Sequence, residues 1–193
     1  MIVGFSTSSA WASVATIDPG SRRVIWQGSE NAPQGASGAC LDLLQKMIEE
    51  TGVRLEDAEL FAADIGPGSF TGVRVGVTLA KTFGHLYSRP VAGASSFDLI
   101  AVDQIVVVPS KKGEFFIRVP GQLPVRSADL PSSAFLGFGP GIDPQVFPDA
   151  SRFFDLLGLL EPVSASEFIP EYLIEPSIST PKKPFASRVG PGG

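Results

Sequence analysis

Residues 63–87 read ADIGPGSFTGVRVGVTLAKTFGHLY, in which a strand-like run ends in Gly66-Pro67-Gly68 and a helix of small residues follows. Backbone N–H groups of a glycine-rich loop at the start of a helix are a common way to bind phosphate. Asp64, at the end of the strand, is a carboxylate of the kind that binds Mg²⁺. The first chemistry to test is therefore nucleotide binding.

Three motifs that would make an active site of this loop are each broken at one position. A P-loop needs a lysine where Val73 stands, and the dinucleotide-binding motif needs a glycine at Thr71. A nucleophile elbow around Ser69 needs a glycine at Pro67, and His85, the one histidine of the chain, falls within the expected helix. Ser69 is then expected to cap the helix, and no catalytic residue is predicted.

The sequence offers few residues that could bind a metal ion. One histidine and one cysteine cannot form a histidine- or cysteine-based zinc site. A carboxylate magnesium site at Asp64 stays open, beside the commoner role of a loop carboxylate that accepts backbone N–H groups. We predict neither a cofactor nor a metal for this chain.

Composition limits the class of protein. The 193 residues are 44% hydrophobic and 18% charged, which is enough apolar material for a core. A net charge of −5 argues against a protein that binds nucleic acid by itself, because such binding depends on Lys and Arg. Cys40 has no second cysteine for an internal disulfide, and neither a signal peptide nor an apolar stretch of about 18 residues is found. These features predict a soluble cytoplasmic protein.

The order of the expected elements predicts an α/β protein with mixed sheets, because three strands precede the first helix. We expect strands at 2–7, 11–18, 24–29, 59–65, 89–94, 104–110, 114–119 and 133–138, long helices at 40–50, 72–87 and 150–162, and a short helix before residue 102. A strand followed by Gly-Pro-Gly occurs at both 60–68 and 134–141, which hints at two related lobes. We expect an N-terminal lobe at 1–102, a reduced C-terminal lobe at 103–175 whose late helix could pack on the first, and an extended tail at 176–193.

A helical projection of residues 72–87 separates two apolar strips. The bulky strip holds Val75, Leu79, Phe83 and Leu86, and the small strip, flanked by Val73 and Val77, holds Gly72, Gly76, Ala80 and Gly84. Small residues at four-residue spacing let a second helix approach closely. Either both strips are buried within this chain, or the bulky strip covers the sheet and the small strip meets another protein together with the 39–50 helix. The second interpretation predicts a partner interface of Cys40, Leu44, Met47, Gly72, Val73, Gly76, Val77, Ala80 and Gly84.

Four stretches resemble the bacterial TsaB (YeaZ) family. They are MIVGFSTSSAWASVATID, GPGSFTGVRVGVTLAK, KKGEFFIRV and PEYLIEPSISTPKK. The resemblance implies an actin/Hsp70/sugar-kinase-type (ASKHA) fold of two lobes and a non-catalytic partner of TsaD in the synthesis of N6-threonylcarbamoyladenosine at tRNA position 37. It also implies TsaE as an ATPase of a larger complex, only indirect contact with tRNA, and a dimer surface on the helices at 39–50 and 72–86.

The chain departs from the family pattern where Ser6 stands in place of an aspartate, and it is short for the family around 99–106 and in the second lobe. Two other functions are alternatives. An ATP-dependent small-molecule kinase of the same superfold would use Asp64 and both Gly-Pro-Gly loops. A peptidase is the weaker alternative, because the sequence lacks a Ser-His arrangement. Two questions stay open: homodimer against heterodimer, and whether Arg74, Lys81, Lys111 and Lys112 touch tRNA.

Overall fold

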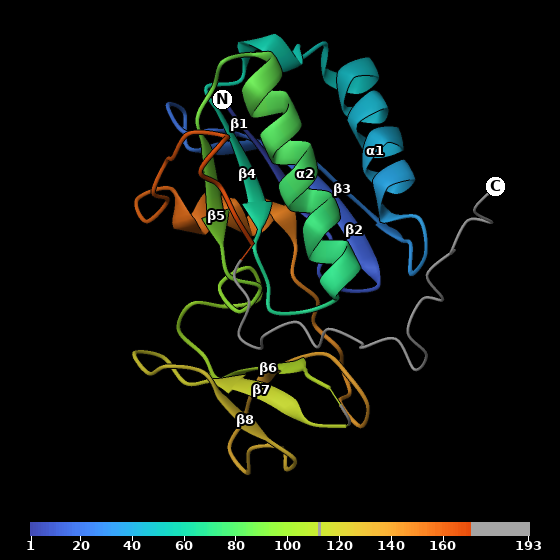
Figure 1. The fold of residues 1–193 in the computed structure, drawn as a ribbon, viewed down its shortest axis with the longest axis vertical. Helices are drawn as coiled ribbons and strands as arrows, with labels where there is room; N and C mark the ends of the chain where they lie inside the picture. Colours follow the sequence, from blue (N-terminus) through green and yellow to red (C-terminus); the bar gives the residue numbers. More distant parts are fainter. Residues whose placement is uncertain (112, 171–193) are drawn as a thin grey trace, which may run out of the picture.

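The computed structural model describes residues 1–111 and 113–170, which are arranged around two β-sheets (Figure 1). The first sheet has five strands in the order β3-β2-β1-β4-β5, and the second has four in the order β8-β7-β6-β9. The strands are β1 (Ile2–Ser6), β2 (Trp11–Asp18), β3 (Arg23–Asn31), β4 (Leu60–Asp64), β5 (Val91–Ala94), β6 (Val106–Pro109), β7 (Phe115–Arg118), β8 (Val125–Ser127) and β9 (Leu136–Gly137). The helices are α1 (Ala36–Thr51), η1 (Leu55–Asp57), α2 (Phe70–Leu86) and η2 (Ala150–Leu156). The tail predicted at 176–193 lies outside the described residues.

The second sheet repeats the strand order of the first. In the first sheet β1 pairs antiparallel with β2 and parallel with β4, and β2 pairs antiparallel with β3. In the second sheet β6 has the same relations to β7 and β9, and β7 pairs antiparallel with β8. Each parallel partner, β4 or β9, leads within two residues into a Gly-Pro-Gly loop. The repeated order supports two related halves, although a boundary at residues 102 and 103 stays a prediction.

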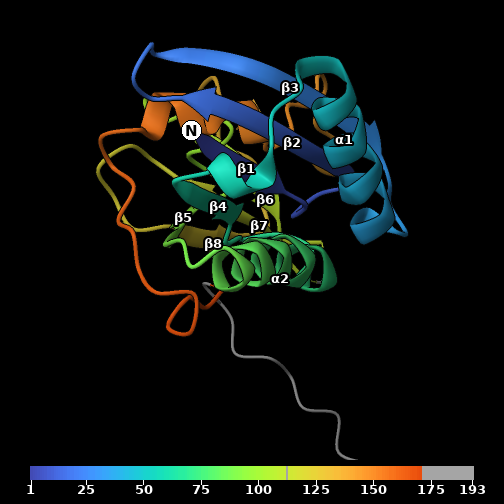
Figure 2. The same cartoon turned by 90° about the horizontal axis from the view of Figure 1, so that it is seen from above.

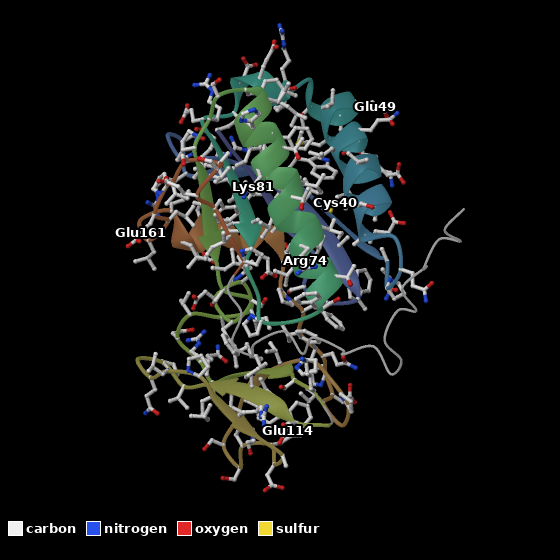
Figure 3. The ribbon with its side chains drawn as sticks, viewed as in Figure 1. Cys40, Glu49, Arg74, Lys81, Glu114 and Glu161 are labelled. Atoms are coloured by element: carbon white, nitrogen blue, oxygen red, sulfur yellow. The ribbon has the colours of Figure 1, made fainter. Side chains whose placement is uncertain are left out.

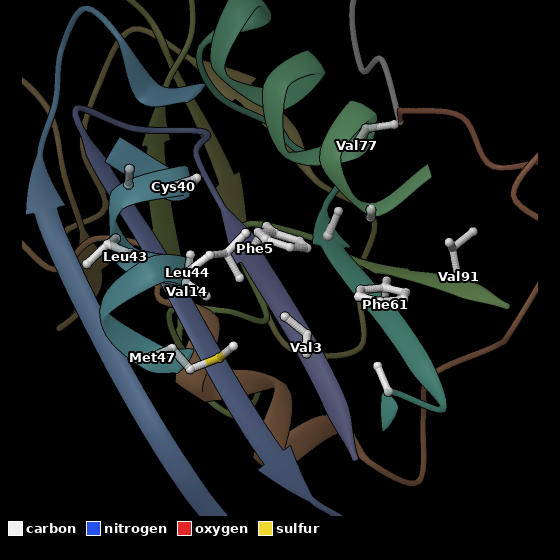
Figure 4. Close-up of a cluster of buried hydrophobic side chains, with 14 of the residues drawn as sticks. Val3, Phe5, Val14, Cys40, Leu43, Leu44, Met47, Phe61, Val77 and Val91 are labelled. Carbon is white, nitrogen blue, oxygen red and sulfur yellow. The ribbon is translucent and has the colours of Figure 1, made fainter. Parts of the chain in front are cut away.

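The long helices lie side by side on one face of the first sheet (Figures 1 and 2). Cys40, Leu44 and Met47 of α1 point onto Val3 and Val14 of the sheet in one cluster (Figure 4). The helix ends at Gly52, which has the left-handed conformation (φ 68°) that glycine adopts without strain. The helix α2 begins where the Ser69 hydroxyl accepts the N–H of Gly72, as expected for a capping serine.

The opposite face of the first sheet is covered by η2, which returns from the second half of the chain. The fully buried Phe153 lies against β1, where Gly4 leaves room for its ring, because a Cβ at Gly4 would be 2.5 Å from that ring. The Ala150 N–H donates to the Ser13 hydroxyl of β2 at 2.9 Å. A helix expected at 150–162 is thus only a short 3₁₀ segment, which starts at an Asp149 cap and ends before Gly158.

The short helix expected before residue 102 is a second difference, because residues 96–100 form turns and no regular helix. Ser95 caps the segment, because its hydroxyl accepts the Asp98 N–H and donates to the Asp98 carboxylate. The N–H groups of Leu99 and Ala101 make helix-type bonds to the carbonyl oxygens four residues before them, but Ile100 bonds only three residues back, to Phe97. The turns end where Arg118 of β7 donates to the carbonyl oxygens of Ala101 and Val102.

Packing of η2 on the first sheet predicts a large effect of one aromatic side chain. Phe153→Ala should lower the free energy of unfolding by about 3–5 kcal/mol, because the neighbouring residues can move only partly into the space that the ring leaves. Leu159→Ala, at a residue 72% exposed, should stay within about 0.5 kcal/mol of the parent. Urea denaturation measures both, and equal, small effects would contradict the packing described.

Candidate functional site

Asp64 lies at the carboxyl end of β4 and is fully buried. Its Oδ2 accepts the hydroxyls of Ser6 at 2.8 Å and Ser8 at 2.5 Å. Its Oδ1 accepts the Ser96 hydroxyl at 2.6 Å and the Gly66 N–H at 2.9 Å. The donors come from the carboxyl ends of the two strands that flank β4, β1 and β5, and from the loop that follows β4. Asp64 therefore ties this edge of the sheet together.

Burial controls the electrostatics of this carboxylate. Removal from water raises the pKa of the Asp64 carboxyl above its ordinary value of 3.8. The hydrogen bonds from Ser8, Ser96, Gly66 and Ser6 favour the charged form and partly oppose that rise. A carboxylate with four protein donors and no exposure has its acceptor positions filled by the chain itself.

The Gly66-Pro67-Gly68 loop closes on the turn between β1 and β2. The Ser69 N–H donates to the Ser8 carbonyl oxygen at 2.6 Å. A Cβ at Gly68 would overlap that same oxygen, and a Cβ at Gly72 would overlap the Thr7 carbonyl oxygen. The glycines are thus needed for contact between two parts of the backbone, where a phosphate-binding loop would need them for a ligand.

This geometry does not favour the kinase alternative. In such an enzyme the loop N–H groups and the strand-end carboxylate face phosphates and Mg²⁺. Here the N–H groups of Gly66 and Ser69 and the carboxylate of Asp64 bond within the chain. In the second Gly-Pro-Gly loop, at 139–141, the Gly139 N–H donates to the Gln145 side chain.

Within residues 1–111 and 113–170 no group of three or more His, Cys, Asp or Glu side chains is placed to hold a metal ion. No helix in the same ranges is long and apolar enough to cross a membrane.

The residues predicted to meet a partner lie inside this chain. Cys40, Leu44, Met47, Gly72, Val73, Gly76, Val77, Ala80 and Gly84 are all buried. Cβ atoms at Gly72 and Gly76 would meet Thr7, and one at Gly84 would lie 2.6 Å from Val91. The interpretation with an open small strip is corrected here: the small strip packs on the sheet, because only small residues fit against the end of β1. Burial also raises the pKa of the Cys40 thiol to about 12.

The bulky strip of α2 lies beside the small strip. The other side of α2 is occupied. Lys81 projects from α2 (Figure 3), and its Nζ donates to the Phe168 carbonyl oxygen at 2.7 Å. Gly84 faces Val91 of β5. Val75 and Leu79 are half-buried, and Leu86 is 64% exposed. Leu79 packs against the core cluster that also holds Cys40, Leu44 and Met47 of α1. Leu86, near the end of α2, lines a surface hollow with Lys81, His85 and Ala165.

Two exposed apolar residues of α1 were missed by the sequence analysis. Leu41 is 51% exposed and Ile48 is 40% exposed. Both lie on the side of α1 opposite to Glu50, which accepts the Trp26 N–H of β3 at 2.6 Å, and so they lie toward α2. We call the set of Leu41, Ile48, Val75, Leu79 and Leu86 the helix seam. The seven-residue spacing of Leu41 and Ile48 and the four-residue spacing of Val75 and Leu79 indicate one side of each helix, and this pattern was visible in the sequence.

Comparison with known proteins relates half of the chain to one pathway. A family model described as "TsaD: tRNA N6-adenosine threonylcarbamoyltransferase" matches residues 30–115. A Buchnera aphidicola subsp. Schizaphis graminum protein named "tRNA threonylcarbamoyladenosine biosynthesis protein TsaB" is 28% identical over 101 residues, which are 52% of this chain and 47% of that protein. The Escherichia coli protein of the same name is 29% identical over 100 residues, 52% of this chain and 42% of that protein. About half of this chain is therefore similar in sequence to proteins named TsaB.

The fold extends the relationship over most of the chain. The solved structure "YeaZ from Pseudomonas aeruginosa" superposes with a TM-score of 0.73, at 21% identity, over 89% of this chain and 99% of that one. The fold is therefore the predicted ASKHA type with two mixed sheets. In sequence, the matched segment spans less than half the length of either TsaB relative.

Ser6 shows how this chain departs from the family pattern. Its hydroxyl donates to Asp64 at the place where an aspartate was expected from the resemblance. A carboxylate there would lie within hydrogen-bonding distance of the Asp64 carboxylate, and two like charges at that separation repel. Serine instead supplies a donor, which fits a structural role for Asp64.

The contact between α2 and β1 predicts opposite effects for two glycine substitutions in helices. Gly72→Ala should lower the free energy of unfolding by more than about 2 kcal/mol, because its Cβ overlaps the Thr7 carbonyl oxygen. Gly38→Ala in α1, where no atom lies within 4 Å of the added Cβ, should raise it by up to about 1 kcal/mol. Thermal or urea unfolding measures the stability of both variants. A Gly72→Ala variant as stable as the parent would show that α2 does not lie this close to β1.

Asp64 predicts a pH dependence with a definite sign. Its pKa is higher in the folded chain than the ordinary value of 3.8, so the folded state holds the proton more tightly. The free energy of unfolding contributed by Asp64 therefore falls as pH rises from about 4 toward the folded pKa. Asp64→Asn cannot ionise, so its stability relative to the parent should increase with pH over this window. Denaturation at several pH values tests this, and a relative stability that decreases with pH would contradict it.

Proposed function

We propose that this chain is a non-catalytic partner of TsaD in the synthesis of N6-threonylcarbamoyladenosine at tRNA position 37. The observation that carries the proposal is the relationship to proteins named TsaB. It is supported by the closed Asp64 site, in which the carboxylate and the neighbouring loop amides bond within the chain. In this proposal TsaD performs the transfer to tRNA.

The helix seam supports a protein partner. Leu41 and Ile48 are two helical turns apart, about 10 Å, and Val75 and Leu86 span about 16 Å of α2. Two parallel apolar rows of this length suit the apolar side of one or two partner helices. Exposed apolar side chains grouped on neighbouring elements are typical of interaction sites, because burying them removes apolar area from water.

The remaining partners follow from the same proposal. A second copy of this chain could use the helix seam in place of TsaD, so the homodimer and the heterodimer would exclude each other. TsaE would join the TsaD complex as its ATPase. With a net charge of −5, the chain would contact tRNA only through its partners, and it would act in the cytoplasm.

The helix seam predicts which surface substitutions abolish complex formation. Leu41→Asp and Leu86→Asp should each weaken binding to TsaD at least about tenfold, because a charge is placed in a desolvated interface. Leu123→Asp, at a residue 87% exposed between β7 and β8, is the matched control and should bind as the parent does. Calorimetry or co-elution with TsaD measures binding, and melting temperatures confirm that each variant folds.

Two results would count against this assignment. If the parent chain neither co-elutes with TsaD nor supports threonylcarbamoyl transfer to tRNA with TsaD and TsaE, the proposed function is wrong. If the parent binds and both seam variants bind equally well, the function stands and the surface lies elsewhere.

A further inference from the structure

Thr7 places a side-chain hydroxyl inside the hydrogen-bond ladder of α2. The residue is fully buried at the end of β1. Its Oγ1 donates to the Gly72 carbonyl oxygen at 2.7 Å and accepts the Gly76 N–H at 3.0 Å. In a regular helix these two groups, four residues apart, bond to each other. The Thr7 hydroxyl thus ties both groups of one helical turn to the end of β1, within a helix that runs unbroken from Phe70 to Leu86.

This contact depends on the two glycines. A Cβ at Gly76 would be 2.8 Å from Thr7 Oγ1, and one at Gly72 would overlap the Thr7 carbonyl oxygen. The hydroxyl therefore defines how close the first two turns of α2 come to the sheet. Val75 of the helix seam projects from the second of these turns, and Leu79 from the next one.

The far half of α2 is held by different contacts. Gly84 lies against Val91 of β5, and Lys81 Nζ donates to the Phe168 carbonyl oxygen. Thr7 is thus a buried side-chain contact to the half of α2 nearest the Gly66-Pro67-Gly68 loop, beside the backbone bond from the Ser69 N–H to Ser8.

We propose that Thr7 is a positioning residue for partner binding: its hydroxyl fixes the depth and direction of α2 and so the placement of Val75 and Leu79. The inference rests on the proposed function for the identity of the partner. It does not need that function for the structural effect, which is measured on the chain alone.

The experiment compares three single variants of the full chain. Thr7→Val keeps the shape and removes the hydroxyl, and the two helical groups can then bond directly. Thr7→Ser keeps the hydroxyl and serves as the conservative rescue. Thr16→Val is the matched control, since Thr16 is also fully buried but donates to the Met47 sulfur at 2.6 Å, away from α2. The readouts are methyl NMR shifts of Val75 and Leu79 in the free chain and the dissociation constant for TsaD.

We expect Thr7→Val to move both methyl resonances and to weaken TsaD binding about tenfold, as the loss of hydrogen bonds to the helix would predict. Thr7→Ser and Thr16→Val should bind within about twofold of the parent. Unmoved methyl shifts with unchanged binding in Thr7→Val would overturn the inference. So would a Thr16→Val variant as impaired as Thr7→Val, because the effect would then be one of general core stability.

Two outcomes separate this inference from the proposed function. If the parent does not bind TsaD, the function fails, and the methyl shifts alone decide whether Thr7 positions α2. If Thr7→Val does not fold, Thr7→Ser becomes the test: it must bind as the parent does, and a tenfold loss there would overturn the role of the hydroxyl.

Discussion

The backbone of α2 lies directly against the end of β1, and much of the first half of the chain depends on this contact. Gly72 and Gly76 allow it, because a side chain at either position would meet Thr7. Each glycine inside a helix costs about 1 kcal/mol relative to alanine, and burial of Val73 and Val77 beside them offsets that cost. The small strip is thus the part of α2 that packs against the sheet.

The same contact explains why the loop is closed and why the helix seam is open. With α2 drawn onto the β1–β2 turn, Ser8 takes the Ser69 N–H, and the hydroxyls around Asp64 are buried beneath it. Of the bulky residues of α2, Phe83 stacks on Phe5 of β1 and Phe61 of β4, while Val75, Leu79 and Leu86 lie to the side. There they form, with Leu41 and Ile48, an apolar surface that this chain leaves partly exposed. The packing of α2 on β1 therefore accompanies both the closed loop and the partly exposed helix seam.

Much of the fold could be predicted from the sequence, because its signals were local. The Ser69 cap, the Gly52 helix end and the early strands follow from residue types at fixed spacings. The repeated Gly-Pro-Gly pattern coincides with a repeated strand order, and the division into two lobes stays a prediction. The strand β8, three residues long, carried too little pattern to be expected.

The candidate site was less predictable, because it depends on long-range contacts. A helical projection shows which residues share a strip of α2 but not which strip faces the sheet. That choice was decided by Thr7, which is 65 residues from Gly72 in sequence. The donors to Asp64 likewise come from positions up to 58 residues away, at Ser6. Steric fit and buried hydrogen bonds between segments far apart in the sequence thus determine which strip faces the sheet and which donors reach Asp64. Helical periodicity alone does not show either.

Amide hydrogen exchange of this chain with and without TsaD tests the central claim most directly. The account predicts slower exchange in complex for peptides that cover residues 41–48 and 75–86, with little change around Asp64 and the 66–69 loop, which are already closed. Protection confined to the loop and the strand ends, with the helix seam unchanged, would contradict it and indicate that the closed site opens to bind.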